Sequence, residues 1–223
     1  MSIPKIIPFV EGQGDEQAVP ILVKRVLKEV IGEQFASNPV DICDAWRVGH
    51  LRKLQNPDNK QWIRLLEAAR RNEASAVLLV LDGDNLGKLC PVNVAKSLIK
   101  SAKPCGAGVG FSVGVVFAMQ EMESWFIADA QALSLSPNTQ PSRRAKPLAA
   151  IPDNLEDNPR DAKGWLSNNM PNDYKPTIHQ AEFASRLNIH TVRSQNLRSF
   201  QRFEHAVQLL YGAVVSRSHI ATP

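Results

Sequence analysis

Along the chain of 223 residues, short continuous apolar runs alternate with longer segments in which apolar residues recur at every third or fourth position. The runs predict buried strands at residues 5–10, 40–46, 76–81 and 111–118. The periodic segments predict amphipathic helices at residues 19–30, 62–69, 92–99, 177–187 and 197–210. Strands and helices in alternation are typical of an α/β fold with a mainly parallel sheet, here of four strands, flanked by helices. Pro8 argues against a central place for the first strand, unless it lies at an edge or a bulge.

The apolar pattern changes in the second half of the chain. Beyond residue 130 the periodicity weakens, and prolines recur between residues 137 and 176. We therefore expect an α/β unit at residues 1–130. A mostly helical C-terminal extension at residues 131–223 is expected to pack on this unit without being independent of it.

The composition is that of an ordinary globular protein, with 43% hydrophobic and 22% charged residues. No apolar run approaches the roughly 20 residues that span a bilayer, and the N-terminal residues lack the apolar stretch of a signal peptide. The three cysteines are scattered, without the spacing of a zinc site or a disulfide framework. These features predict a cytoplasmic protein with reduced thiols and no contact with a membrane.

The net charge is +4 at pH 7, which permits binding to nucleic acid without establishing it. Several basic residues lie in the second half of the chain, namely Arg143, Arg144, Lys146, Lys175, Arg198 and Arg202. Arg198 and Arg202 are four residues apart and so share one face of a predicted helix. For each arginine alone, a solvated basic face is the simpler interpretation.

Two aspartates, Asp82 and Asp84, directly follow the apolar run at residues 76–81. In open α/β sheets, ligands bind at the carboxyl ends of the strands, and Gly83 allows a tight turn that aims both carboxylates at one point. Hard oxygen ligands of this kind suit magnesium, manganese or calcium. A plain Asp–Gly turn is the simpler alternative. An EF-hand loop is excluded, because Leu86 occupies the fifth position, which needs an oxygen ligand, and Asn93 occupies the twelfth, which needs an acid.

Further acidic residues follow two other predicted strands. Glu11 ends the first strand, and Glu121 and Glu123 follow the fourth. Acids at the carboxyl ends of three parallel strands would converge on one edge of the sheet and form a candidate site. Asp15 and Glu16 also follow the first strand, but they lie at a helix start, where negative charge is favourable in any case.

The loop after the first strand contains Gly12 and Gly14, which invites comparison with nucleotide-binding loops. A dinucleotide-binding fingerprint would need a third glycine at position 17, where the chain has Gln17. The chain also lacks the Gly-Lys-Ser/Thr ending of a P-loop. Neither type of nucleotide site is therefore expected.

Three motifs in order resemble the TOPRIM catalytic fold of topoisomerases, primases and the OLD-family nucleases: Phe9-Val-Glu-Gly-x-x-x-Glu16, Leu81-Asp-Gly-Asp84 and Gln120-Glu-x-Glu-x-Trp-x-x-Ala-Asp129. The chain is most similar to a bacterial and phage-borne TOPRIM-like family that is known as a domain of unknown function and is grouped near the OLD nucleases. Later segments of that family are matched by Pro159–Leu166, Tyr174-Lys175 and Phe200-Gln-Arg-Phe203. The resemblance thus covers most of the chain and implies that residues 1–130 form a TOPRIM-like catalytic domain.

The resemblance implies roles for particular residues. Glu11 corresponds to the TOPRIM glutamate that binds metal or shuttles a proton. Asp82 and Asp84 correspond to its metal-binding aspartates. The implied catalytic residues are Glu11, Asp82, Asp84 and Glu123. The implied metal ligands are Glu11, Glu16, Asp82, Asp84, Glu121 and Glu123. The residues implied in nucleic-acid binding are Lys175, Arg198 and Arg202.

These roles predict a nuclease that depends on Mg²⁺ or Mn²⁺ and cleaves DNA or RNA, because divalent ions stabilise the charge that develops on a phosphodiester. A role in mobile-element or phage defence is implied only by the proteins near which this family is grouped. One alternative is a haloacid-dehalogenase-like phosphatase with Asp82 as nucleophile. Another is a metal-binding nucleic-acid module that needs a partner. OLD nucleases often depend on an ATPase, and because this chain has no Walker motif, that ATPase would be a separate protein.

Overall fold

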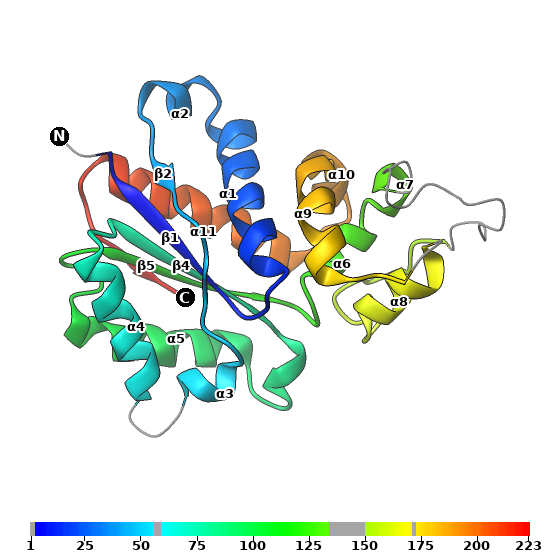
Figure 1. Ribbon diagram of the computed structural model, residues 1–223, viewed down its shortest axis with the longest axis horizontal. Helices are drawn as coiled ribbons and strands as arrows, with labels where there is room; N and C mark the ends of the chain where they lie inside the picture. Colours follow the sequence, from blue (N-terminus) through cyan, green and yellow to red (C-terminus); the bar gives the residue numbers. More distant parts are fainter. Residues whose placement is uncertain (1–2, 56–58, 134–149, 171–172) are drawn as a thin grey trace.

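In a computed structural model, which describes residues 3–55, 59–133, 150–170 and 173–223, the strands form one parallel sheet (Figure 1). Its order is β2-β1-β4-β5-β6, and β3 also pairs with β1. The strands in these residues are β1 (Lys5–Val10), β2 (Asp41–Ile42), β3 (Trp46–Arg47), β4 (Ala76–Asp82), β5 (Ser112–Ala118) and β6 (Ala221–Thr222). The predicted α/β fold with a mainly parallel sheet is confirmed. The second predicted strand is divided into β2 and β3, and β6 was not predicted.

Helices cover both faces of the sheet (Figure 1). One face carries α1 (Asp15–Ile31), α2 (Glu33–Ser37) and α11 (Arg198–Val215). The other carries α3 (Leu51–Leu54), α4 (Lys60–Arg71) and α5 (Pro91–Ala102). Beyond the carboxyl ends of the strands lie α6 (Glu123–Ile127), α7 (Ala130–Leu133), α8 (Ala162–Asn169), α9 (Pro176–Arg186) and α10 (Ile189–Ser194). Two short 3₁₀ helices span Asp84–Leu86 and Lys103–Cys105.

The central strand β4 explains both the core and the direction of Asp82. Its side chains alternate between the two faces, as in any strand. Leu78 and Val80 pack in the core beneath α1 and α11, whereas Val77 and Leu79 pack against the helices of the other face. Asp82 continues this alternation, so its carboxylate lies on the side of α1 at the carboxyl end of the sheet.

Pro8 lies in a strand with neighbours on both sides, not at the edge of the sheet. The carbonyls of Ile6 and Val10 accept hydrogen bonds from the side of β2 and β3, where the donors are the N–H groups of Cys43 and Val48. Pro8 lies between these two residues and faces the interruption between β2 and β3. Because the neighbouring strand is broken there, the missing N–H of proline costs no ladder hydrogen bond.

The second half of the chain contributes to the same core as the first. α9 packs along α1, and α11 packs on β5. Gly114 lets α11 approach closely, because a β-carbon there would lie 3.2 Å from Leu210 Cδ1. Trp125 of α6 contacts the rings of Phe200 and Phe203. The division at residue 130 stays a prediction.

Among the helices that the structure describes, none is both long and apolar enough to cross a membrane.

Candidate metal centre

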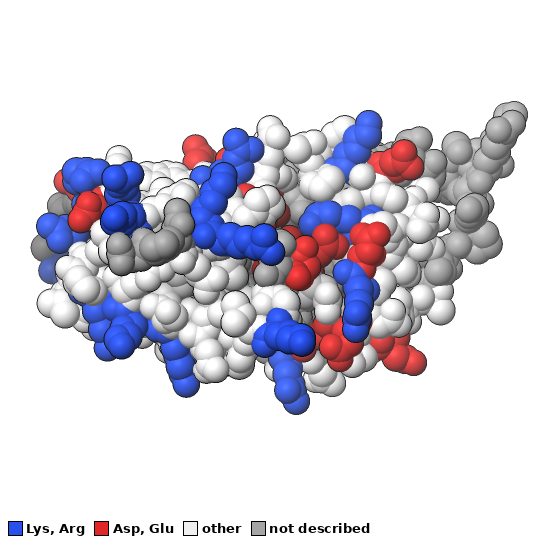
Figure 2. Space-filling model, turned by 90° about the horizontal axis from the view of Figure 1, so that it is seen from below, with Lys and Arg blue, Asp and Glu red and all other residues white. Residues whose placement is uncertain are grey.

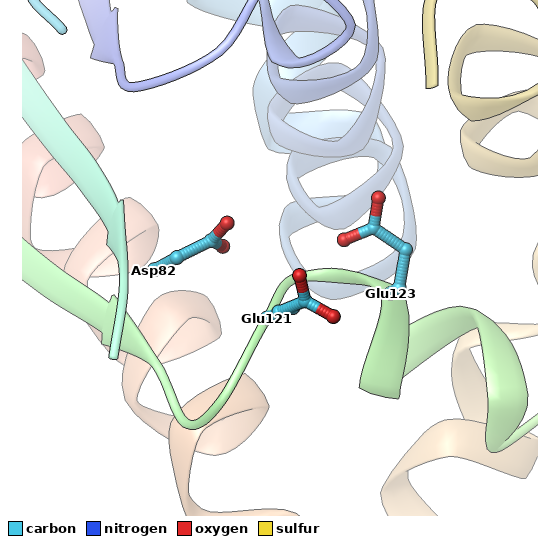
Figure 3. Close-up of side chains that lie close together, drawn as sticks. All are labelled: Asp82, Glu121 and Glu123. Carbon is cyan, nitrogen blue, oxygen red and sulfur yellow. The ribbon is translucent and has the colours of Figure 1, made fainter. Parts of the chain in front are cut away.

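Three buried or nearly buried carboxylates meet at the carboxyl end of the sheet (Figure 3). Asp82 is the last residue of β4, Glu121 lies in the loop after β5, and Glu123 is the first residue of α6. One oxygen of each lies within 4.8 Å of the others. The side chains point into a common space in front of the first turns of α1 (Figure 3). The structure thus brings together three of the six residues that the sequence analysis expected to bind metal.

Backbone hydrogen bonds between the ends of β4 and β5 fix this arrangement. Gly83 donates its N–H to the carbonyl of Ala118 at 2.7 Å, and Asp84 donates to the carbonyl of Gln120 at 2.8 Å. A β-carbon on Gly83 would lie 2.9 Å from that same Ala118 oxygen, so the close approach requires glycine. The Asp82 carboxylate in turn accepts the N–H of Met122 at 3.0 Å.

Lys163 of α8 places its ammonium group where the three carboxylates meet. Its Nζ lies 2.7 Å from Glu121 Oε1, 3.3 Å from Asp82 Oδ2 and 3.6 Å from Glu123 Oε2. Its backbone N–H also donates to Glu121 Oε2 at 3.0 Å. Burial alone would lower the pKa of Lys163, but the neighbouring carboxylates outweigh burial and raise that pKa above its usual value.

Glu123 is the most deeply buried member of the cluster, with none of its surface exposed. Its Oε1 accepts hydrogen bonds from the hydroxyl of Tyr174 at 3.0 Å and from the side-chain amide of Gln180 at 2.9 Å. Its Oε2 is also buried and accepts no hydrogen bond from the described residues. Burial raises the pKa of Glu123 to about 7, although the Lys163 ammonium opposes this rise.

Asp15, the first residue of α1, places a further negative charge near the same cluster. Its carboxylate accepts the N–H of Gly12 at 2.8 Å. Burial is the main cause of the raised pKa of Asp82, and the negative charge of Asp15 adds to the effect of Glu123. From the sequence, Asp15 is explained by its place at a helix start. Its position shortly after the end of β1 was the signal that it could also face the site.

Glu11 and Asp84 lie beside the cluster, in the wall of a cavity of about 520 Å³ that Asp82 and Lys163 also line. Glu11 is buried, and its Oε1 lies 2.5 Å from Nδ1 of the exposed His50. Burial raises the pKa of Glu11, and the contact with His50 opposes this. No feature of the sequence pattern pointed to His50, because the turn that brings it to Glu11 follows the unexpected division between β2 and β3.

A second cavity, of about 640 Å³, borders the site on another side. Its wall includes Met119, Gln120 and Arg160. Asp84 lines both cavities, so both border the end of β4. Of the three carboxylates, Asp82 lines the first cavity and none lines the second.

The other expected site residues lie elsewhere. Glu16 faces Arg47, with 3.7 Å between Oε1 and Nε, and does not belong to the three-carboxylate cluster. Lys175 directly precedes α9, and Arg198 is the first residue of α11. Arg202 donates a hydrogen bond to the carbonyl of Pro223. In the described part of the chain, these three cations line neither cavity, whereas Arg47, Lys53 and Arg160 do. Arg143, Arg144 and Lys146 fall outside the described residues.

Figure 2 shows how charge is distributed on one face of the molecule. Several Asp and Glu side chains lie together right of the centre of this face, others lie at its left and upper edges, and Lys and Arg side chains lie between and around them. This distribution is suited to an anionic ligand only if a cation neutralises the acids.

Fold and site together define a parallel α/β protein with a buried carboxylate cluster at the carboxyl ends of its central strands. The chain belongs to the family described as "Domain of unknown function (DUF4276)", which matches residues 10–208. The matched residues include the three carboxylates, Lys163 and the Glu11–His50 pair. Comparison with curated proteins and with solved structures found no match.

Proposed function

We propose that this protein is a nuclease of the TOPRIM type that uses Mg²⁺ or Mn²⁺ to hydrolyse phosphodiester bonds in DNA or RNA. The observation that carries the proposal is the convergence of Asp82, Glu121 and Glu123 on one point, at which a positively charged group already lies. Carboxylates from separate segments of the chain at the end of a sheet are the donor set that such a reaction needs.

The residues present fit a hard divalent cation. All donors are carboxylate oxygens, which suit Mg²⁺ and Mn²⁺ better than softer metals. The Glu123 Oε2 atom is buried without a hydrogen bond from the described residues, and a cation would satisfy it. Asp82, Glu121 and Glu123 would hold the ion, which when bound would polarise a phosphate and activate water.

The remaining acids have roles that their surroundings support. Glu11 is buried and its Oε1 contacts Nδ1 of His50, which lines the same cavity, so this pair could orient a group that binds there. Asp84 is exposed and lines both cavities, where it can orient water or a further cation. Asp15 adds negative charge behind the cluster and so favours a cation there.

The two cavities favour a polymer over a small phosphate ester. Because Asp84 lines both, a chain that passes Asp84 could extend into the two cavities on either side of the bond that is cleaved. Arg47 and Lys53 on one side, and Arg160 on the other, could hold the flanking phosphates. The proposal includes a cytoplasmic location. It also includes a separate ATPase partner, because the OLD nucleases that the chain resembles often depend on an ATPase.

The experiment is a cleavage assay on single- and double-stranded DNA and RNA, in Mg²⁺, in Mn²⁺ and in EDTA. Wild type is compared with Asp82→Asn, Asp84→Ala and the control Glu16→Gln, which removes an acid outside the cluster. We expect metal-dependent cleavage that Asp82→Asn and Asp84→Ala abolish and Glu16→Gln retains. Full activity in folded Asp82→Asn would refute the proposal. A phosphoenzyme trapped at Asp82 with a small phosphate ester would identify a phosphatase instead.

A further inference from the structure

We infer that Lys163 is an internal counter-cation, which holds the metal position in the metal-free protein and is displaced when a divalent ion binds. This inference rests on the proposed metal site and adds a mechanism for its loading. It concerns the competition between two cations for one set of oxygens, which the resemblance to TOPRIM proteins does not address.

The distances make the two cations mutually exclusive. The ammonium group lies between 2.7 and 3.6 Å from one oxygen of each of the three carboxylates. A magnesium ion at about 2.1 Å from those oxygens would occupy nearly the same point. The like charges of the two cations would also repel strongly in a partly buried site. Lys163 Nζ must therefore move before the ion is bound.

The Lys163 side chain can leave the three carboxylates without a change in the fold. Its side chain is 36% exposed and lines the 520 Å³ cavity, so the ammonium can turn into solvent without crossing the core. Its backbone stays attached, because the Lys163 N–H donates to Glu121 Oε2 and the Asp161 side chain caps α8 by accepting the N–H of Gly164. The exchange thus needs a change in one side chain and not the departure of α8.

The charge balance explains why a counter-cation is needed at all. Asp82 and Glu123 lie close together with little or no exposed surface, and burial penalises both in their charged form. An ammonium group compensates part of that negative charge. A divalent ion compensates more of it, so it can replace the lysine, whereas a monovalent ion offers no such gain.

The test compares Mn²⁺ binding by calorimetry in wild type and in Lys163→Met, a substitution that keeps the length of the side chain and removes its charge. We expect Lys163→Met to bind Mn²⁺ at least tenfold more tightly. The matched control is Lys53→Met, which removes a lysine from the same cavity that, unlike Lys163, forms no ion pair with Asp82, Glu121 or Glu123 among the described residues. Lys53→Met should bind Mn²⁺ within about twofold of wild type, which separates direct competition from a general change in charge.

Lys163→Met could unfold in the absence of metal, so the wild-type protein supplies a second measurement. Lysine acylation, followed by mass spectrometry, should be slow at Lys163 without metal and at least tenfold faster in saturating Mg²⁺. The rate at Lys53 should not change. An unchanged Lys163 rate in a protein shown to bind Mg²⁺, or equal Mn²⁺ affinity in wild type and Lys163→Met, would overturn this inference and leave the proposed function intact. If neither wild type nor folded Lys163→Met binds Mn²⁺, both the inference and the proposed metal site are wrong.

Discussion

Gly14, in the turn that precedes α1, lies against the side chain of Gln180 in α9. A β-carbon on Gly14 would meet Gln180 Oε1 and would lie 2.8 Å from the backbone carbonyl carbon of Pro176. The absence of a side chain at Gly14 therefore lets the first turn of α9 reach the buried cluster. That approach brings the amide of Gln180 to Glu123.

We expect Gly14→Ala to push α9 away from α1 and to lower the free energy of unfolding by about 1–3 kcal/mol, as overpacking of a tight contact does. Urea denaturation measures this change. Gly212→Ala is the matched control, because a β-carbon at this position in α11 would meet no atom within 4 Å. That control should raise stability by about 0.5–1 kcal/mol, since alanine is the better helix former. Equal effects of the two substitutions would contradict the role given to Gly14.

Tyr174→Phe tests the support of Glu123. The substitution removes a buried hydroxyl that donates to Glu123 Oε1 at 3.0 Å. Above the Glu123 pKa of about 7, where the carboxylate is charged, a hydrogen bond of this kind contributes about 1.5–3 kcal/mol to stability. We expect a loss of that size in chemical denaturation and a several-fold weaker affinity for Mn²⁺. Tyr211→Phe also removes a hydroxyl, but one that donates to the carbonyls of Gln34 and Asn38. It should lower stability and leave the affinity for Mn²⁺ unchanged.

The raised pKa of Glu123 predicts an unusual dependence of stability on pH. Between the ordinary pKa of 4.5 and the pKa of about 7 in the folded protein, the folded state keeps a proton that the unfolded state has released. Stability in EDTA should therefore fall as the pH rises through this window, by about 3 kcal/mol at most from this group. Asp82, whose pKa is also raised by burial, contributes with the same sign.

Glu123→Gln isolates that contribution. The variant should lose much of the slope between pH 4.5 and 7, and the difference from wild type is measured by urea denaturation at a series of pH values. Metal binding should show the opposite trend. Because an ion binds the deprotonated carboxylates, the affinity for Mn²⁺ should rise with pH up to about 7 and then level off. Parallel stability curves for wild type and Glu123→Gln would show that Glu123 titrates normally.

The arginines of the two cavities test the proposed path of the substrate. Arg47→Ala and Arg160→Ala should each raise the KM for a long oligonucleotide several-fold, with a smaller effect on kcat, because they remove contacts to flanking phosphates. Cleavage of a small aryl phosphodiester should not change. Arg198→Ala, at a residue that lines neither cavity, is the comparison. An equal or larger effect of Arg198→Ala would favour the surface that the family resemblance implies.

Local patterns in the sequence predict much of this fold. The apolar run that ends at Asp82 predicts the central strand, and the three- and four-residue spacing from Val19 to Val30 predicts α1. The same signals are absent from the two-residue strands. β6 consists of Ala221 and Thr222, which pair with β5 through the backbone and carry no apolar pattern of their own.

The site was predictable only in part, for a related reason. Acids that follow strands converge because parallel strands end at one edge, and the sequence shows where each strand ends. Lys163 follows no strand, and α8 has a weak apolar pattern in which only Ala162 and Leu166 are buried. Its role depends on the docking of a segment about 40 residues beyond Glu121 and Glu123, which no local spacing reports.

The contact between Lys163 and three carboxylates also has a consequence for how relatives of this protein diverge. A buried acid without a counter-charge is costly, and so is a lysine among neutral neighbours. Loss of the lysine should therefore be tolerated mainly in lineages that have already replaced one of the acids, and the reverse order should apply equally. The four positions, which lie in three separate segments of the chain, are then expected to change together. In an alignment of the family, we expect position 163 to covary with positions 82, 121 and 123 as a group.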